Sequence, residues 1–147
     1  MRFIEYMDVG NRNDWIRERV LPSQELLQRI RVRWPLTALE PAYAGEVARR
    51  YAFDDGAGEI GFISSVTQPF CGDCTRARLS SDGKLYTCLF AAEGVDLRSP
   101  LRGGASDEEL LSLIRAVWER RIDRYSELRD QLRARGMQHV EMNHVGG

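Results

Sequence analysis

The sequence predicts a mixed α+β fold, in which short strands and antiparallel hairpins precede a helical last third. Two turn signals indicate the hairpins: an Asp- and Gly-rich turn over residues 54–58, and the dipeptide Asp82-Gly83, each flanked by apolar residues. Helices are indicated by apolar residues that recur every three or four positions after Ser106. With 147 residues, 43% of them hydrophobic, the chain is long enough to bury a core.

The first third predicts a strand and a helix. Residues 2–7 form a short apolar-rich strand, and Ser23 is the expected N-cap of a helix over residues 23–33 that ends at Pro35. A buried strand with no partner nearby indicates that the chain begins partway into a larger fold. The Pro- and Gly-containing stretch over residues 36–45 is the expected connector to a second module.

The two hairpins and the terminal helices follow. The first hairpin joins residues 46–53 to 59–66, and the second joins 76–80 to 84–90. Ser106 and Glu109 have the spacing of a capping box. The helix after them carries an apolar stripe through Trp118, which we expect to be buried in the core. A second helix is expected over residues 126–135, with Gly136 ending it.

Charge and apolar content exclude several classes of protein. Positive side chains number 21 and negative ones 22, for a net charge of −1, so the chain lacks the basic surface that nucleic-acid binding needs. No window approaches the roughly 20 apolar residues of a membrane span. The charged N-terminus lacks a signal-peptide core, which predicts a cytoplasmic protein. Three clustered cysteines favour metal or redox chemistry over a secreted disulfide framework.

The cysteines have the spacing Cys-x2-Cys-x13-Cys, formed by Cys71, Cys74 and Cys88. The first two precede the second hairpin and the third lies on its returning strand, so the hairpin should bring the three sulfurs to one end. Three thiolates can hold a [4Fe–4S] cluster and leave its fourth iron open. They can also bind zinc if His139 or His144 supplies a fourth ligand. Spacing alone leaves both readings open, together with three ordinary buried thiols.

The residues around the cysteines decide between these readings. The run Cys71-Gly72-Asp73-Cys74-Thr75-Arg76-Ala77-Arg78, with Cys88 in the returning strand, closely resembles the C-terminal cluster motif of the GTP 3′,8-cyclase family. These are radical S-adenosylmethionine (SAM) enzymes of molybdenum cofactor biosynthesis. The resemblance covers nearly the whole chain, in residues 69–90, 2–10, 22–26, 59–64 and the terminal Gly146-Gly147.

The resemblance implies a fold and a set of cofactors. Residues 1–35 would be the last strand and helix of an incomplete α/β radical-SAM barrel, and residues 36–147 an auxiliary [4Fe–4S] and GTP-binding domain. The family's Cys-x3-Cys-x2-Cys motif, which holds the first [4Fe–4S] cluster that cleaves SAM, is absent here. SAM and that first cluster are therefore expected only in the full-length enzyme, and the chain alone should be inactive.

The resemblance also assigns the substrate site. Cys71, Cys74 and Cys88 match the ligands of the second cluster, whose open iron coordinates the purine of GTP in the family. Arg76, Ala77 and Arg78 match the segment that contacts GTP, with both arginines directed at the triphosphate. Residues i and i+2 of a strand share a face, so the two guanidinium groups should point the same way.

Further matches concern the edges of the active site. Met7 matches a barrel-strand methionine that contacts SAM, and Gly146 and Gly147 match a double glycine that reaches into the active site. Catalytic residues stay unassigned. His139 and His144 are expected to be surface or packing residues once the resemblance is admitted.

The implied reaction is a lyase reaction that converts GTP to (8S)-3′,8-cyclo-7,8-dihydroguanosine 5′-triphosphate. A cyclic pyranopterin monophosphate synthase would then use that product. We also expect a homodimer, because an open strand edge favours association. The alternative reading is a zinc-stabilised interaction domain without catalysis. A radical SAM enzyme with a peptide substrate is a third reading, which Arg76 and Arg78 disfavour.

Overall fold

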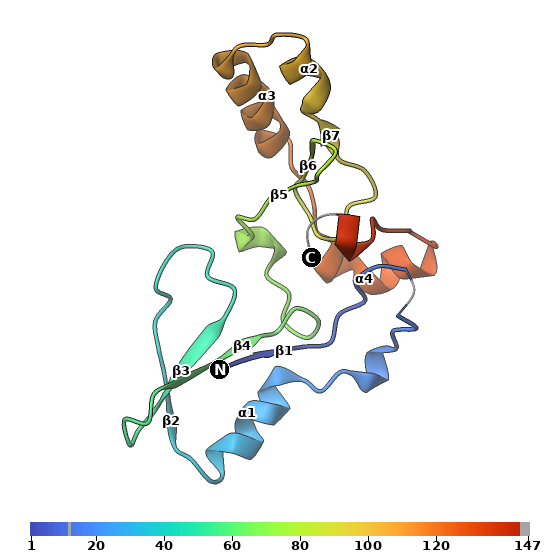
Figure 1. Ribbon diagram of the computed structural model, residues 1–147. Helices are drawn as coiled ribbons and strands as arrows, with labels where there is room; N and C mark the ends of the chain where they lie inside the picture. The colour runs from blue at the N-terminus through green and yellow to red at the C-terminus, as the bar shows by residue number, and fades with distance from the viewer. Residues whose placement is uncertain (12, 145–147) are drawn as a thin grey trace. The chain divides into compact units, whose positions relative to one another are not determined.

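Two separate sheets organise the chain in the computed structural model, which describes residues 1–11 and 13–144 (Figure 1). The first unit consists of Met1–Asp8 and Trp15–Thr75, and the second of Val9–Asp14 and Arg76–Gly147. The fold is α+β, with one mixed and one antiparallel sheet. The boundary expected between residues 35 and 36 lies inside the first unit, so the proposed division into barrel end and auxiliary domain stays a prediction.

A four-stranded sheet with the order β1-β4-β3-β2 forms the first unit. Its edge strand β1 runs parallel to β4, and the remaining pairs are antiparallel. The elements of this unit are β1 (Arg2–Ile4), η1 (Arg17–Arg19), α1 (Ser23–Arg31), β2 (Leu36–Ala38), β3 (Arg49–Phe53), β4 (Glu59–Ile63) and η2 (Cys71–Asp73). Helix α1 lies along one face of the sheet (Figure 1).

The core of the first unit explains this arrangement. Alternate β4 residues Ile60 and Phe62 point to the same face and pack with Leu27 of α1. Phe62 is only 2% exposed and meets the ring of Tyr51 edge-on. The stretch expected to be a connector therefore contains a strand: Leu36 is buried in this core and pairs with β3. Burial of the Leu36 side chain therefore outweighs the turn preference of the Pro- and Gly-containing stretch around it.

Ser23 does not cap α1, which corrects the expectation from the sequence. It is the first helical residue, and its amide donates to the Glu5 carboxylate at 2.8 Å. Glu5 also accepts from the Val66 amide and from the amide and hydroxyl of Thr67. Burial raises the pKa of Glu5, but these hydrogen bonds outweigh it and hold the pKa below the usual 4.5. One carboxylate thus joins three segments of the first unit.

Replacing Glu5 with glutamine should lower the free energy of unfolding at pH 7 by about 3 kcal/mol, because an amide cannot accept all these hydrogen bonds. A carboxylate whose pKa is lower in the folded protein than in the unfolded protein stabilises the fold at pH values above its unfolded pKa. This stabilisation is lost as the pH falls through the folded pKa. The difference between Glu5→Gln and the parent should therefore narrow below pH 4.5. Urea unfolding at several pH values measures this difference in the free energy of unfolding. The control is Glu40→Gln, because Glu40 is exposed. A pH-independent difference would contradict the assignment.

A three-stranded antiparallel sheet, in the order β5-β6-β7, is the centre of the second unit. The hairpin at Asp82-Gly83 is confirmed, but its strands are shorter than expected, and β7 and α2 were not predicted. The bounds are β5 (Arg78–Leu79), β6 (Lys84–Tyr86), β7 (Val95–Asp96), α2 (Arg98–Arg102), α3 (Asp107–Glu119), α4 (Tyr125–Ala134) and η3 (Met142–His144). Of the helices described, none is long and apolar enough to cross a membrane.

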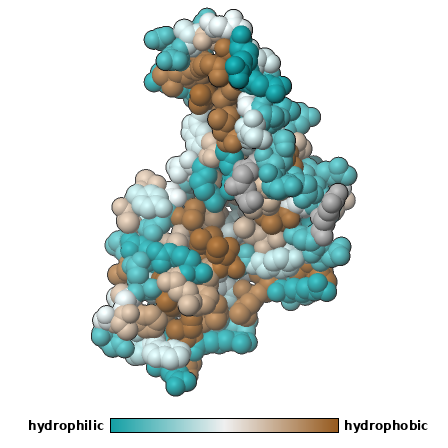
Figure 2. Space-filling view, in the orientation of Figure 1, coloured by the Kyte–Doolittle hydropathy of each residue, from teal (hydrophilic) through white to brown (hydrophobic). Residues whose placement is uncertain are grey.

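Helices α3 and α4 of the second unit form where expected, but the apolar stripe of α3 is not core. Ser106 and Glu109 make the capping box that begins α3. No residue of α3 is buried, and Trp118 is 37% exposed. Figure 2 shows apolar surface over α2 and α3. Among the described residues of this unit, the buried apolar side chains are Tyr86, Phe90 and Tyr125, and the rings of Phe90 and Tyr125 stack.

Candidate functional site

Cys71 and Cys74 lie on one tight turn of the first unit. Cys71 begins the 3-10 turn η2, and the Cys74 amide donates to the Cys71 carbonyl at 3.4 Å. Both side chains are partly buried. The short Cys-x2-Cys spacing therefore has a local structural cause, since one helical turn separates the two thiols. Such a turn can present both sulfurs to one metal centre.

Cys88 follows β6 in the second unit. The Phe90 amide donates to the Cys88 sulfur at 3.4 Å, and the Ala91 amide donates to the Cys88 carbonyl. Next to it, the Thr87 hydroxyl donates to Asp123 at 2.5 Å. An N–H donor to sulfur stabilises a thiolate, and such bonds also tune iron–sulfur clusters.

The donor set fits a thiolate-held cluster in its chemistry. None of the three cysteines forms a disulfide, all three are partly buried, and Cys88 receives an amide hydrogen bond. Cys71 and Cys74 belong to the first unit and Cys88 to the second. Over residues 1–11 and 13–144, no group of three or more His, Cys, Asp or Glu side chains is arranged to hold a metal ion. A joint site of all three thiols therefore stays a prediction.

Gly45 contacts the cysteine turn. Its φ of +80° suits glycine, and an added Cβ would lie 2.8 Å from the Thr75 hydroxyl and 3.0 Å from the Asp73 carbonyl. The loop before β3 can approach residues 73–75 only because no side chain intervenes. This contact is invisible in the sequence, where Gly45 only marks a turn.

Replacing Gly45 with alanine should displace the cysteine turn and at least double the rate at which a chelator removes reconstituted iron, about a 0.5 kcal/mol loss at the site. Gly56→Ala is the matched control, because Gly56 has a similar φ of +77° but no atom within 4 Å of the added Cβ. Both variants have an alanine at a positive φ and therefore the same backbone strain, but only the added Cβ of Gly45→Ala contacts residues next to the cysteine turn. Equal rates for the two variants would show that the contact is unimportant.

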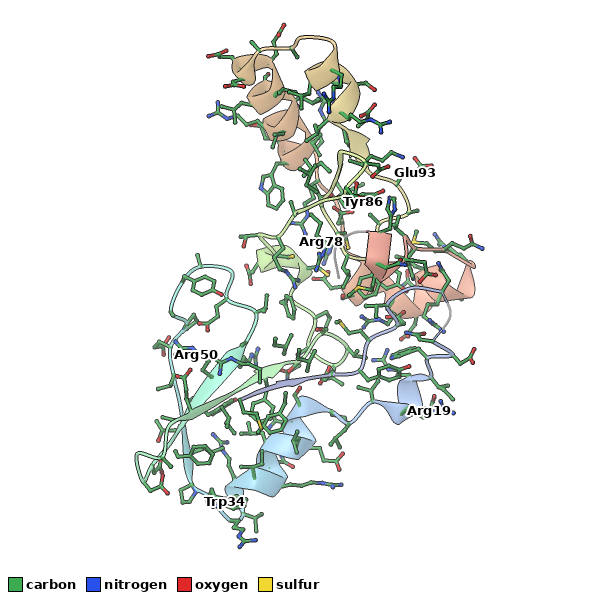
Figure 3. The ribbon with its side chains drawn as sticks, viewed as in Figure 1. Arg19, Trp34, Arg50, Arg78, Tyr86 and Glu93 are labelled. Atoms are coloured by element: carbon green, nitrogen blue, oxygen red, sulfur yellow. The ribbon has the colours of Figure 1, made fainter. Side chains whose placement is uncertain are left out.

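The arginine segment is only partly a strand. β5 contains Arg78 but begins after Arg76 and Ala77, so the expectation that both arginines share a strand face is not confirmed. β6 ends at Tyr86, which is the residue opposite Arg78. Figure 3 labels Arg78 and Tyr86 on this sheet. Among the described residues, no carboxylate forms an ion pair with Arg78.

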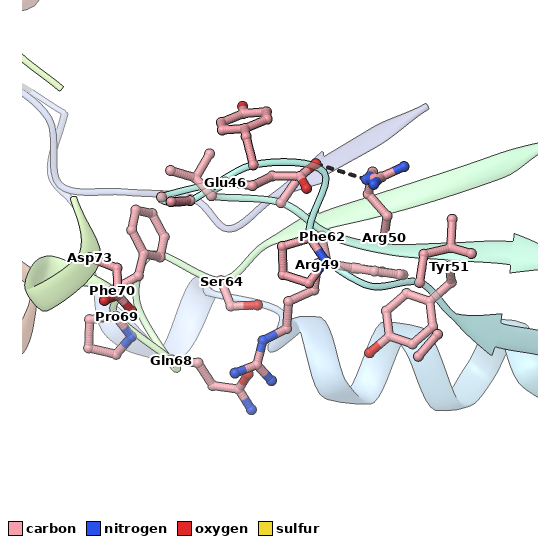
Figure 4. A pocket seen from close by; sticks show the side chains of 18 residues that line it. Glu46, Arg49, Arg50, Tyr51, Phe62, Ser64, Gln68, Pro69, Phe70 and Asp73 are labelled. Carbon is pink, nitrogen blue, oxygen red and sulfur yellow. Dashed lines mark ion pairs between the residues drawn. The ribbon is translucent and has the colours of Figure 1, made fainter. Parts of the chain in front are cut away.

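A cavity of about 600 Å³ lies beside the cysteine turn within the first unit. Its walls come from residues 38–51 and from residues 62–73, including Phe70 and Asp73. Arg49 and Gln68 extend to the same side of this cavity (Figure 4). The sequence predicted the pairing of β3 with β4 but not the cavity, because no local pattern places residues 38–45 opposite residues 68–73.

The remaining predicted positions have separate environments. Met7 is partly buried and packs against Trp15, Val20 and Val66, as an ordinary core residue would. This contact neither supports nor opposes a role in SAM binding. Gly146 and Gly147 lie outside the described residues.

The two histidines serve structural contacts. His139 is 8% exposed, packs edge-on against Phe90 and Tyr125, and its Nδ1 lies 3.2 Å from the Phe90 carbonyl. His144 lies 3.5 Å from Asp82. Each ring therefore has a described partner within the second unit, in agreement with the expectation of packing and surface roles.

By fold and residue content, the molecule is a mixed α+β protein with three cysteines outside any disulfide and an arginine-bearing hairpin. The chain belongs to the Molybdenum Cofactor Synthesis C family, which its residues 1–127 match. This membership agrees with the resemblance seen in the cysteine and arginine segment.

Curated relatives place the chain more narrowly. It is 54% identical over all 147 residues to a GTP 3′,8-cyclase of Xanthomonas axonopodis pv. citri, and spans 43% of that relative. It is 52% identical to a GTP 3′,8-cyclase of Synechococcus sp. strain CC9605, over 41% of that protein. A third, from Acidothermus cellulolyticus, is 55% identical over 133 residues. The chain corresponds to the C-terminal part of these relatives and spans about two fifths of their length.

Proposed function

We propose that the chain is the substrate-binding C-terminal part of a GTP 3′,8-cyclase, a lyase that uses radical SAM chemistry on GTP. The observation that carries the proposal is the high identity to GTP 3′,8-cyclases along the whole chain. The three cysteines, none of which forms a disulfide, and the position of Arg78 in β5 support it. The product would be (8S)-3′,8-cyclo-7,8-dihydroguanosine 5′-triphosphate, which a cyclic pyranopterin monophosphate synthase would consume.

The chain's own residues have two tasks in this proposal. Cys71, Cys74 and Cys88 would hold an auxiliary [4Fe–4S] cluster, which when bound offers the purine an iron without a protein ligand. Arg76 and Arg78, with the backbone at Ala77, would bind and orient the triphosphate, because guanidinium forks donate paired hydrogen bonds to phosphate oxygens. The triphosphate end and the base end of GTP would thus be held by different groups.

Other parts of the proposal concern the remainder of the enzyme. Met7 would contact SAM, and Gly146 and Gly147 would reach the active site. SAM and the first cluster would need the rest of the full-length protein. The edge strand β1 would contact the rest of the barrel in the full-length protein. Its neighbouring side chains Ile4 and Tyr6 are exposed and would lie in that contact. Homodimerisation and a cytoplasmic location stay predictions.

Anaerobic reconstitution with iron and sulfide tests this function. We expect about four irons and four acid-labile sulfides per chain, because three thiolates suffice for one [4Fe–4S] cluster. The loaded chain should bind GTP but produce no 5′-deoxyadenosine from SAM and dithionite. Zinc without acid-labile sulfide would overturn the proposal in favour of a zinc-stabilised domain. Formation of 5′-deoxyadenosine would show that a SAM-cleaving motif was overlooked.

A further inference from the structure

Three polar side chains of the first unit converge on one small recess of the cavity beside the cysteine turn. The sheet register brings them together, because Arg49 of β3 lies opposite Phe62 of β4, on the face that packs against α1. Ser64 comes two residues after Phe62 and therefore continues on that face. The Gln68 backbone amide donates to the Ser64 carbonyl at 3.0 Å, and this turn places Gln68 beside the other two.

The recess has a volume of about 10 Å³, which is room for about one water-sized group. Its lining includes Arg49, Ser64 and Gln68, together with Gln24 in the first turn of α1. The first three of these residues also line the cavity of about 600 Å³, so the recess opens into that cavity (Figure 4). A ligand in the cavity can therefore place one oxygen atom in the recess.

The polar groups around the recess lack partners in the part of the chain that the structure describes. Ser64 is only 6% exposed, yet its hydroxyl forms no hydrogen bond within residues 1–11 and 13–144. Over the same residues, the Arg49 guanidinium has no ion pair and the side-chain amide of Gln68 has no hydrogen bond. Nearly all buried polar groups of folded proteins are hydrogen-bonded, because an unmade bond is costly. The buried Ser64 hydroxyl therefore indicates a partner from outside the chain.

The first turn of α1 adds a backbone donor to the recess. The Ser23 amide is already bonded to Glu5, but the next amide, that of Gln24, has no acceptor among the residues described. The N-cap of α1 supplies no side-chain hydrogen bond either. Glu25, in the same turn, is ion-paired with Arg29. An unbonded amide and the positive end of the helix dipole therefore favour an anion here.

The charges around the recess also favour an anion. None of the residues that line it is acidic, and Arg49 is positive. Two carboxylates line the larger cavity outside the recess. Glu46 forms an ion pair with Arg50 at 2.8 Å, and Asp73 belongs to the cysteine turn. The positive charge of Arg49 is therefore the one next to the buried hydroxyl.

We propose that the cavity binds a small organic phosphate monoester, with one phosphate oxygen in the recess. Phosphate accepts hydrogen bonds from several directions, and the recess offers a guanidinium, a primary amide, a hydroxyl and a backbone amide. The cavity of about 600 Å³ has the usual size of a small-molecule site and exceeds what phosphate alone needs. Its walls include Tyr43 and Phe70, against which an organic group can pack. Arg76 and Arg78, assigned to GTP, are not involved, so the inference does not depend on the proposed function.

Phenyl phosphate is the probe, because it joins one phosphate to one aromatic ring. Titration into the 147-residue chain, followed by NMR, should shift the backbone amide resonances of Ser64 and Gln68. Arg49→Ala should weaken this binding about tenfold, through loss of the charge-assisted hydrogen bonds. Arg19→Ala is the matched control, because Arg19 is exposed in the first unit and lines neither the cavity nor the recess. Equal affinities of the two variants would overturn the site.

A charge change at Gln68 gives a second test that leaves the core intact, since Gln68 is exposed. A carboxylate in Gln68→Glu should repel the phosphate and weaken binding about tenfold. Gln28→Glu is the matched control in α1, because Gln28 is exposed and lies outside the recess. Thermal unfolding of both variants checks that the fold is retained. Unchanged phenyl phosphate affinity in a folded Gln68→Glu variant would contradict the proposal.

Other probes define the ligand class and separate this site from the proposed GTP site. Inorganic phosphate and benzoate should each bind more weakly than phenyl phosphate, and equal binding of either would overturn the assignment to an organic phosphate. Arg78→Ala should leave the affinity for phenyl phosphate unchanged, and Arg49→Ala should leave GTP binding by the reconstituted chain unchanged. Loss of phenyl phosphate binding in Arg78→Ala but not in Arg49→Ala would place the probe at the proposed GTP site and overturn the inference alone.

Discussion

Replacing Cys88 with alanine should abolish the iron and sulfide uptake of the reconstituted chain. Only three cysteines are present, so the variant would leave two thiolates for a cluster that normally has three or four protein ligands. Cys71→Ala and Cys74→Ala should have the same effect. Metal and sulfide analysis, together with the visible absorption spectrum, measures the loss.

The outcome also tests whether all three thiolates bind one cluster. Cys71 and Cys74 share the η2 turn, whereas Cys88 belongs to the second unit. Loss of the cluster in all three variants would support one metal centre with all three thiolates as ligands. Thr87→Ala is a control for local disturbance near Cys88, since it removes the hydroxyl bound to Asp123 and keeps every thiol. A Cys88→Ala chain that retains a full cluster would exclude Cys88 as a ligand.

Replacing Arg78 with alanine should weaken GTP binding by about tenfold or more without changing the iron content. Each charge-assisted hydrogen bond to phosphate is worth roughly 1.5–3 kcal/mol, and about 1.4 kcal/mol corresponds to tenfold. Arg76→Lys should also lose affinity, because a point charge cannot reproduce the bidentate guanidinium fork. Anaerobic calorimetry of the cluster-loaded variants measures both effects.

Guanosine provides the internal control for the arginine variants. The arginines are assigned to the triphosphate, so the loss should be larger for GTP than for guanosine. Arg102→Ala, an exposed arginine in α2, should leave both affinities unchanged. Equal losses for GTP and guanosine would show that the substitution disturbed the hairpin. Unchanged GTP affinity in a double alanine variant of Arg76 and Arg78 would remove the phosphate-binding assignment.

Local chemistry explains what the sequence predicted well. The capping box at Ser106 and the periodic residues after it specify α3, because both signals act within one or two helical turns. The Asp82-Gly83 turn specifies the second hairpin in the same way. The cysteine spacing and its neighbours identified the family, which the match over residues 1–127 confirms. In each case the informative residues lie close together in the chain.

Tertiary structure alone decided the contacts between distant segments. β1 pairs in parallel with β4, although Phe3 and its partner Phe62 are far apart in sequence, and no local pattern specifies such a partner. Glu5 is an isolated acid in an apolar stretch until it meets the amides of Ser23 and Val66. Hydrogen bonds and buried surface formed across long separations depend on the whole chain. The sequence therefore determined α3, α4, the hairpins and the cysteine motif, whereas only packing revealed the role of Glu5 and the parallel pairing of β1 with β4.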